Sequence, residues 1–513
     1  MPFYSILFDR PSADTRAISL DEPDFFSDLN LDQVVAAIVA GREKYELRTF
    51  FHAPLRDPDA VRYRQEVMRD LASERAKDAI KAFARGMQSA RQHLSGADQS
   101  RERFYTERLF LDAAAVYCDA VTSLTEELTH MTLTSRGLLA FRDYLGEYTR
   151  GSRFTSLVSG TQLQCEALAT VKYNLHIDAG RVTVSRYGGE GDYSIEVEEA
   201  FAKFQRGATR DYRVAFPDSP GMDLVEARIF ELVARLHSDI FSGLDDYYNC
   251  HHHRPLLDEC LERFDREVQF YIAFLDFMEP LNRAGLSFCY PDVSVDSKEV
   301  CATEVYDLAL ACKLILGNTA VVVNSFHLED PERVIVVTGP NQGGKTTFAR
   351  MFGQLHYLAG LGLPVPGREA RLFLPDQMFA HFERQEHVEN LRGKLEDELL
   401  RARDMLRRAT SRSVIIMNEG FTSTTLSDAL LLGTEVLRRM LRMDLLCVYV
   451  TFVDELASLS EATVSMVATV DESDPTRRTY RIVREPASGL AYAAAIANKY
   501  GLGYERLKER LAS

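Results

Sequence analysis

Apolar residues recur at helical spacing through most of the first half of the chain. LNLDQVVAAIVAG (29–41) and DPDAVRYRQEVMRDLA (57–72) show this spacing, with acidic residues near their starts. A helix that buries one face needs such a stripe, so both segments predict helices, and Asp57-Pro58 is typical of a helix entry. Charge-rich helical spacing continues to about Tyr148, and the charges there are interpreted as solvated surface.

The pattern changes near residue 172. YNLHIDAGRVTVSRY alternates apolar and polar residues on both sides of Asp178-Ala179-Gly180, which predicts a β-hairpin. GGEGD predicts a loop, and YSIEVEEAF begins like a strand. Helical spacing resumes at MDLVEARIFELVARLHSDIF and continues from Pro255 to Gly285, which favours a long antiparallel helix pair.

From LSFCYPDVSV onward, short apolar runs alternate with helical segments. This alternation indicates an α/β domain. The runs that predict strands are AVVVN, VIVVT, SVIIMN, LLCVYVTF and TYRIVRE.

One predicted strand runs into a motif that carries chemistry. VIVV is followed by Gly339 to Thr346, which fits G-x-x-x-x-G-K-[ST], and then by the helical segment TFARMFGQLHYLAG. Glycines let backbone N–H groups turn toward phosphates, and the helix N-terminus adds a positive dipole. The predicted nucleotide-binding residues here are Gly339, Pro340, Asn341, Gln342, Gly343, Gly344, Lys345, Thr346 and Thr347. Lys345 is expected to reach the β- and γ-phosphates of ATP, and Thr346 to ligate Mg²⁺.

A second predicted strand supplies an acidic residue. SVIIMNEG ends in Asn418 and Glu419, where nucleotide-hydrolysing sites place a metal-facing acid and a general base. Asn418 carries no charge but is expected to contact Mg²⁺ through water, and Glu419 is the predicted catalytic base. A surface glutamate at a strand end is the alternative interpretation.

Composition narrows the class of protein. The chain has 513 residues, is 46% hydrophobic and has a formal net charge of -16, which argues against generic nucleic-acid binding but leaves a local basic lining open. Its eight scattered cysteines predict reduced thiols, and no signal peptide or membrane span is evident, so a cytoplasmic protein is expected. His251 to His253 beside Cys250 suggest a metal site, but a polar turn between two helices is the better interpretation.

These residues resemble the MutS-type DNA mismatch repair ATPases. GPNQGGKTT is similar to the family's phosphate loop, and NEGFTSTTLSDA to its acidic strand end and Thr-Ser-Thr turn. Between them, LGLPVPGREARLFLPDQMFAHF resembles the segment in which those proteins carry a Gly-x-x-Val-Pro-Ala run and then a strand. AAAIANKYGLGYERLKERL resembles the C-terminal helix pair, and FFHAPLRDPDAVRYRQEVMRDL resembles the core helical domain more loosely. The resemblance covers about Phe50 to the C-terminus. It implies a dimer whose helical levers form a clamp around DNA, with ATP sites at the dimer interface.

The resemblance also implies an organisation. The expected fold class is α+β multidomain, with an all-helical core or lever region, a small β-insert and a C-terminal α/β P-loop ATPase domain of the ABC type. The predicted domains are a lead-in at 1–50, a helical core at 51–155, a clamp-like β-insert at 156–215, a helical lever at 216–290 and the ATPase domain at 291–513. Asn324, in AVVVN, resembles a family position near the nucleotide.

Several residues depart from the family's pattern. Gly393 and Lys394 take the place of the serine that completes the partner's site, and we expect them to act in trans on the γ-phosphate. Phe452 replaces a histidine, Asn418 replaces an aspartate, and a mismatch-recognition module is expected to be absent. Slow ATP hydrolysis, or a switch governed by ATP binding, is therefore expected.

Basic residues of the β-insert, such as Lys172, Arg181, Arg186, Lys203 and Arg206, are candidate phosphate contacts. The insert also holds acidic residues, namely Glu190, Asp192, Glu196, Glu198 and Glu199, so a structural hairpin is an equal alternative.

Three functions follow from these observations. The first is an ATP-dependent homodimer that binds mismatched or branched DNA duplex in repair or recombination. The second is a nucleotide-gated ATPase whose helical arms act on a protein partner and do not bind DNA. A metabolic ATPase or kinase is the third and is weaker, because no substrate-pocket motif is visible.

Overall fold

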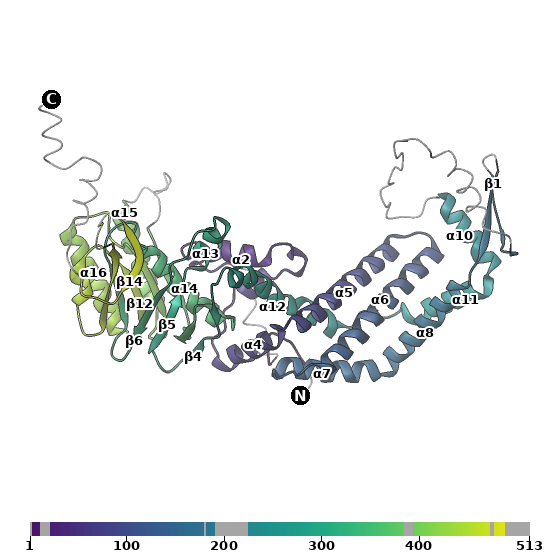
Figure 1. Ribbon diagram of the computed structural model, residues 1–513, viewed down its shortest axis with the longest axis horizontal. Helices are drawn as coiled ribbons and strands as arrows, with labels where there is room; N and C mark the ends of the chain where they lie inside the picture. The colour runs from purple at the N-terminus through teal and green to yellow at the C-terminus, as the bar shows by residue number, and fades with distance from the viewer. Residues whose placement is uncertain are drawn as a thin grey trace, which may run out of the picture. The chain divides into compact units, whose positions relative to one another are not determined.

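The computed structural model describes residues 3–10, 21–178, 181–189, 224–383, 393–471, 474 and 477–487. These residues fall into two compact units (Figure 1). Unit 1 comprises Met1–Phe3, Glu74–Leu133 and Ala140–Asp265, and unit 2 comprises Tyr4–Ser73, Thr134–Leu139 and Arg266–Ser513. Within the described ranges, no helix is long and apolar enough to cross a membrane.

Unit 1 is built mainly from helices, as the helical spacing of its sequence predicts. Helices α5 and α6 pack closely along each other, and a Cβ at Gly86 of α5 would lie 2.5 Å from the Ala120 Cβ of α6. Phe141 stacks on Phe264 with ring centroids 3.5 Å apart. The helices with most of their residues in this unit are α5 (Glu74–Gln99), α6 (Arg103–His130), α7 (Arg136–Arg150), α8 (Ser152–Ala169), α10 (Leu224–Leu236) and α11 (Ser238–His251).

The predicted β-hairpin is confirmed in unit 1. Strand β1 (Tyr173–Asp178) pairs antiparallel with β2 (Arg181–Arg186), with Asp178 opposite Arg181. Most of its side chains are exposed, including the apolar Leu175 and Ile177. The predicted loop GGEGD lies mostly outside the described residues, as do YSIEVEEAF and the basic and acidic candidates from 190 to 206.

The helical segment predicted over 222–241 is divided into two helices in the structure. Helix α10 ends at Leu236 and α11 starts at Ser238, with His237 between them in a non-helical conformation. His251 ends α11, and His252 stacks on Tyr248 with ring centroids 4.4 Å apart. The histidine run thus lies where one helix ends before α12 (Glu259–Arg283), as the polar-turn interpretation expects.

Unit 2 contains a six-stranded sheet in the order β10-β11-β12-β7-β13-β14. The first five strands are parallel and β14 is antiparallel to β13. All side chains of β7, β11 and β12 are buried. This burial on both faces explains why their sequences are continuous apolar runs and do not alternate between apolar and polar residues. The strands are β10 (Met378–His381), β11 (Val414–Asn418), β12 (Leu446–Val450), β7 (Val334–Thr338), β13 (Thr463–Val470) and β14 (Arg478–Val483).

Helices cover both faces of this sheet. On one face, α15 (Lys394–Arg408) and α16 (Leu426–Arg442) pack on Val336, Met417 and Tyr449. On the other face lies α14 (Lys345–Gly360), where a Cβ at Gly353 would meet the Ile416 side chain at 3.4 Å. This α/β layering agrees with the predicted fold of the C-terminal part.

Smaller sheets accompany the main one in unit 2. A four-stranded sheet has the order β4-β9-β5-β6, and β3 pairs with β8. These elements, with the nearby helices, are β3 (Phe288–Cys289), β4 (Asp292–Ser294), β5 (Val300–Val305), α13 (Leu308–Leu316), β6 (Asn324–Leu328), β8 (Val365–Pro366), β9 (Glu369–Phe373) and η2 (Asp454–Ser458).

The strand predicted for AVVVN is wrong. Val322 and Val323 are exposed and belong to no strand, and β6 begins only at Asn324. The valines of the run precede the strand, because β6 pairs with β5 through residues from Asn324 to Leu328. Apolar and β-branched residues favour a strand only where a neighbour offers pairing.

The N-terminal segment of unit 2 packs against α14. Gln354 donates to the Leu29 carbonyl (2.9 Å), and the Tyr357 hydroxyl donates to the Phe51 carbonyl (2.6 Å). The segment holds α2 (Leu31–Val39), η1 (Glu43–Tyr45), α3 (Arg48–Phe51) and α4 (Pro58–Leu71), and it confirms the helices predicted over 29–41 and 57–72. This N-terminal segment belongs to the same compact unit as residues 266–513. The predicted domain boundaries instead separate residues 1–50 and 51–155 from the predicted ATPase domain. Those domain boundaries stay predictions.

Candidate phosphate-binding site

The phosphate loop lies between β7 and α14, in the predicted strand–loop–helix context. Gly339 follows the last residue of β7 with φ 114°, and Gly344 precedes α14 with φ 94°. Both values lie in the left-handed region that favours glycine. Gln342, the one other residue of the loop with positive φ (62°), is exposed. The loop therefore has its glycines at the backbone positions that require them.

Close packing against β13 also requires glycines in this loop. A Cβ on Gly339 would lie 2.8 Å from the Ala468 carbonyl oxygen, and one on Gly343 would lie 2.9 Å from the Ala468 Cβ. Such contacts are shorter than carbon atoms tolerate, so Ala468 of β13 and the two glycines form one tightly fitted unit. This contact partner was not evident in the sequence, because Ala468 is remote along the chain.

Lys345 is the first residue of α14 and is buried. Its Nζ donates to the carbonyl oxygens of Gly339 (2.9 Å) and Pro340 (3.2 Å). Burial lowers the pKa of Lys345, and the charges of Glu419 and Asp454 oppose that shift. The charge of Glu419 thus acts on Lys345, the other predicted key residue. Thr346 and Thr347 follow on the first turn of the helix, both partly exposed.

Asn418 and Glu419 lie at the end of β11, two strands away from the phosphate loop. Among the described residues, the Asn418 Oδ1 is buried and has no hydrogen-bond partner. A buried acceptor without a partner is costly, and a donor such as metal-bound water would satisfy it. The Thr338 hydroxyl, at the end of β7, is likewise buried without a hydrogen-bond partner among the described residues. These orphaned groups fit a hydrated Mg²⁺ beside the loop.

Glu419 adopts an unusual backbone conformation. Its φ is 54° and that of Phe421 is 63°, although neither is glycine. The Glu419 N–H donates to the Val450 carbonyl (2.9 Å), and the Phe421 N–H donates to the Glu398 Oε2 (3.1 Å). Left-handed non-glycine residues cost free energy and cluster at functional sites. Glu398 was not singled out in the sequence, since its partner lies 23 positions away.

The Thr-Ser-Thr-like turn follows Phe421. Thr425 caps α16, its hydroxyl accepting from the Asp428 N–H (3.3 Å), and the hydroxyls of Thr424 and Thr425 both contact the Asp428 carboxylate (3.1 and 2.9 Å). Phe452, which follows β12, is 46% exposed. The ring therefore lies at the surface on the edge that also holds Glu419.

The other predicted site residues have the following positions. The Asn324 side chain accepts from the Ile482 N–H (2.7 Å) and donates to the Tyr480 carbonyl (3.3 Å). Its amide group therefore makes two hydrogen bonds to the backbone of β14. Gly393 precedes α15 and is exposed, and Lys394 forms an ion pair with Glu383. Their roles toward a nucleotide stay predictions.

Strand β14 brings two further residues to the loop that the sequence did not indicate. The Arg478 Nε donates to the Asn341 carbonyl (3.2 Å). The Tyr480 Cβ lies 3.8 Å from where a Cβ on Gly344 would stand, and the Tyr480 side chain is exposed. Arg478 and Tyr480 come close to the phosphate loop because β14 runs back antiparallel along β13. This contact depends on the sheet topology and has no local sequence signal.

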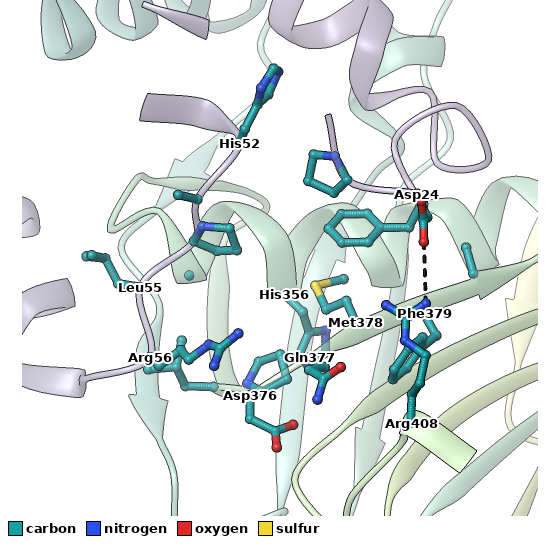
Figure 2. Close-up of a pocket in the computed structure, with 18 of the residues that line it drawn as sticks. Asp24, His52, Leu55, Arg56, His356, Asp376, Gln377, Met378, Phe379 and Arg408 are labelled. Atoms are coloured by element: carbon teal, nitrogen blue, oxygen red, sulfur yellow. Dashed lines mark ion pairs between the residues drawn. The ribbon is translucent and has the colours of Figure 1, made fainter. Parts of the chain in front are cut away.

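A cleft of about 1170 Å³ lies elsewhere in unit 2, beside the C-terminal half of α14 (Figure 2). Its walls include His356, Gln377 and Met378, and Arg408 pairs with Asp24 across 3.6 Å at one side. None of the predicted nucleotide-binding residues lines it. The phosphate loop and this cleft therefore adjoin opposite ends of α14.

Comparison with known proteins agrees with these features. Residues 335–508 match the family model of MutS domain V. The DNA mismatch repair protein MutS of Desulfovibrio desulfuricans is 29% identical over 193 residues, which are 37% of this chain and 20% of that protein. Endonuclease MutS2 of Thermus thermophilus is 28% identical over 189 residues, 36% of this chain and 25% of that protein. The chain thus spans about a quarter or less of the length of these curated relatives. Residues 335–508, which contain the phosphate loop, thus match domain V of the MutS family.

Proposed function

We propose that this protein is an ATPase of MutS type that uses ATP binding to control a dimeric DNA clamp. The observation that carries the proposal is the arrangement at the sheet edge. A glycine-built loop leads into α14 at Lys345, and Glu419 and the unpartnered Asn418 Oδ1 lie at the end of a nearby parallel strand. Phosphoryl transfer needs these groups for positioning and charge stabilisation.

Each residue of the site has a role in this proposal. The amides of 339–344 and the positive end of α14 hold the phosphates, and Lys345 leaves the Gly339 and Pro340 carbonyls for phosphate oxygens. Thr346 would ligate Mg²⁺ and Asn418 would accept a hydrogen bond from a water on the ion, which when bound would supply positive charge against the phosphates. Glu419 orients and deprotonates the attacking water. Hydrolysis is slow because Asn418 lacks the charge of a carboxylate.

Dimerisation places the start of α15 against the partner's nucleotide. Gly393 would offer a backbone N–H and Lys394 an ammonium group to the γ-phosphate of the partner subunit. Two large apolar side chains, Leu426 and Phe452, are exposed on the edge that holds Glu419. Apolar groups of this size favour an interface over contact with water, which supports a homodimer across this edge.

DNA contact is assigned to the hairpin of unit 1. Lys172 and Arg181 are exposed in and next to it, and Asp178 is the acidic residue within β1 and β2. Basic side chains on an otherwise acidic protein are suited to phosphates, whose neutralisation supplies most of non-specific affinity. The resemblance to mismatch repair proteins points to mismatched or branched duplex.

A protein partner is the second candidate for the arms. The net charge of -16 opposes DNA binding, and the hairpin exposes Tyr173, Leu175 and Ile177 on one face. An apolar strip of this kind suits a protein surface better than a phosphate backbone.

Equilibrium binding to a DNA panel tests the proposal. The panel holds matched duplex, single-mismatch duplex, single strand and a four-way junction, with and without ATP and at two salt concentrations. We expect salt-sensitive binding that prefers one structure and changes with ATP, and the ATP response should disappear in Lys345→Ala. ATP binding without binding to any DNA would favour the protein-partner function.

The hairpin has its own matched test. The double variant Lys172→Ala with Arg181→Ala should weaken binding to every DNA and reduce the salt slope by about 2. Thr183→Ala with Ser185→Ala changes the same hairpin without removing charge and should bind as the unmodified protein does. Equal binding by both pairs would remove the hairpin from the DNA interface.

A further inference from the structure

The acidic turn at 418–421 contains two residues in a backbone conformation that their side chains oppose. Glu419 has φ 54° and Phe421 has φ 63°, with Gly420 between them. A left-handed residue other than glycine costs about 1–2 kcal/mol, so the turn persists only where its surroundings hold it. The turn carries the proposed catalytic base, and its geometry therefore sets where that carboxylate lies.

Three contacts restrain the turn. The Glu419 N–H is held by the Val450 carbonyl of β12 at 2.9 Å. The Phe421 ring is fully buried. A Cβ on Gly420 would lie 3.0 Å from the Met417 side chain and 3.3 Å from the Tyr449 hydroxyl, so the turn fits closely against β11 and β12. These contacts hold Glu419, Gly420 and the Phe421 ring in place. The backbone N–H of Phe421 still needs a hydrogen-bond acceptor.

Glu398 supplies that acceptor. Its Oε2 lies 3.1 Å from the Phe421 N, and the side chain is 2% exposed. A carboxylate accepting from a backbone N–H forms a hydrogen bond stronger than one between neutral groups. Burial of a charged group is unfavourable unless it is compensated, so the burial of this glutamate requires an explanation.

Glu398 lies on the buried face of α15, unlike the charged residues on the exposed face of the helix. It stands one turn after Lys394, the first residue of the helix, and its neighbour Glu396 is exposed. Burial raises the pKa of Glu398, and the hydrogen bond from Phe421 opposes that shift. The helix thus places one carboxylate inward, against the backbone just beyond the catalytic base.

We propose that Glu398 is a positioning residue for Glu419, because its carboxylate holds the Phe421 N–H and thereby keeps the left-handed turn in place. This inference rests on the proposed ATPase function and deepens it. Without the acceptor, Phe421 can relax toward an ordinary backbone conformation, and the Glu419 carboxylate two residues away shifts. A displacement of about 1 Å in a catalytic group can lower a rate by about 100-fold.

Two substitutions of similar volume isolate the acceptor. Glu398→Gln keeps an oxygen that can accept from the Phe421 N–H, whereas Glu398→Met fills the space without one. We expect Glu398→Met to lower the kcat of ATP hydrolysis by about 10- to 100-fold with the Kd for ATP within about twofold. Glu398→Gln should keep kcat within about threefold of the unmodified protein. Glu396→Ala, on the exposed face of the same helix, is the control and should leave both quantities unchanged.

Amide hydrogen exchange gives a readout that does not depend on turnover. Exchange in the segment 418–421 should be faster in Glu398→Met than in Glu398→Gln, because the Phe421 N–H loses its acceptor. Equal exchange and equal kcat in the two variants would overturn the positioning role. If the unmodified protein shows no ATP hydrolysis that depends on Lys345, the proposed ATPase function fails, and the inference fails with it. Hydrolysis that needs Lys345 but is indifferent to Glu398→Met overturns the inference alone.

Discussion

Two turns at the same edge of the main sheet reach the left-handed backbone region in different ways. The phosphate loop uses glycine at Gly339 and Gly344, where positive φ carries no side-chain penalty. The acidic turn uses Glu419 and Phe421, which pay that penalty and are held by Val450 and Glu398. One turn is therefore encoded by its own residues, and the other depends on contacts from distant parts of the chain.

The largest expected effect comes from breaking the glycine-built turn. Gly339→Ala adds a Cβ 2.8 Å from the Ala468 carbonyl oxygen at a residue with φ 114°. Backbone strain and overpacking each cost about 1–3 kcal/mol, so ATP affinity should fall by about 100-fold or more. Isothermal titration with ATP measures this. The control is Gly146→Ala, where the new Cβ meets only the Arg150 side chain at 3.6 Å. Tight ATP binding by Gly339→Ala would contradict the fitted loop.

The second effect separates chemistry from binding in the acidic turn. Glu419→Gln keeps the size and backbone of the turn but removes the base, so ATP hydrolysis should slow by about 100-fold or more. ATP affinity should stay unchanged, because the phosphate loop is intact. Single-turnover hydrolysis and ATP titration measure the two quantities. Glu435→Gln, on α16, is the matched control. Undiminished hydrolysis in Glu419→Gln would assign the base to another residue.

A moderate effect is expected where the acidic turn meets β11. Asn418→Asp places a charge at a buried position whose Oδ1 lacks a partner. Without nucleotide, an uncompensated buried charge should lower the free energy of unfolding by about 1–3 kcal/mol. Mg²⁺ with ATP should recover this loss and speed hydrolysis, because a carboxylate binds metal-bound water more strongly than an amide does. Urea unfolding with and without Mg²⁺ and ATP measures the recovery. The same loss under both conditions would place Asn418 outside the metal site.

The smallest effect concerns the pH dependence of the contact that holds the acidic turn. Burial raises the pKa of Glu398 above its ordinary value of 4.5. Between that value and the raised one, the folded state keeps a proton that the unfolded state has released, so stability falls as pH rises through this window. Glu398→Gln cannot titrate and should lack this slope. Urea unfolding of both proteins across the window measures the difference. A stability that instead rises with pH, relative to Glu398→Gln, would mean that the hydrogen bond outweighs burial.

Much of the sheet and helices around the phosphate loop could be predicted from the sequence. The runs VIVVT, SVIIMN and LLCVYVTF contain the fully buried parallel strands β7, β11 and β12, and the loop from Gly339 to Thr346 has the expected strand before it and helix after it. Helix entries such as Asp57-Pro58 were also correct, since the Asp57 side chain accepts from the Asp59 N–H. These features depend on neighbours within a few residues.

Other features could not be predicted because they join distant segments. AVVVN has strand propensity, yet β6 pairs with β5 only from Asn324, the last residue of this run, onward. The close fit of Ala468 against two glycines arises where β13 lies beside β7. The packing of 21–73 on α14 uses backbone carbonyls, such as those of Leu29 and Phe51, which have no sequence signature.

The sequence by itself determined the local chemistry: a glycine-rich loop with Lys345 and Thr346, a strand ending in Asn418 with Glu419 after it, and the presence of most strands and helices around them. Backbone freedom, side-chain charge and hydrophobic period are properties of neighbouring residues, so they can be read in order along the chain. Only the tertiary structure decided that Glu398 accepts from Phe421, that Ala468 closes on the phosphate loop and that β14 brings Arg478 beside Asn341. Those contacts exist because folding brings residues far apart in the chain within hydrogen-bond or van der Waals distance.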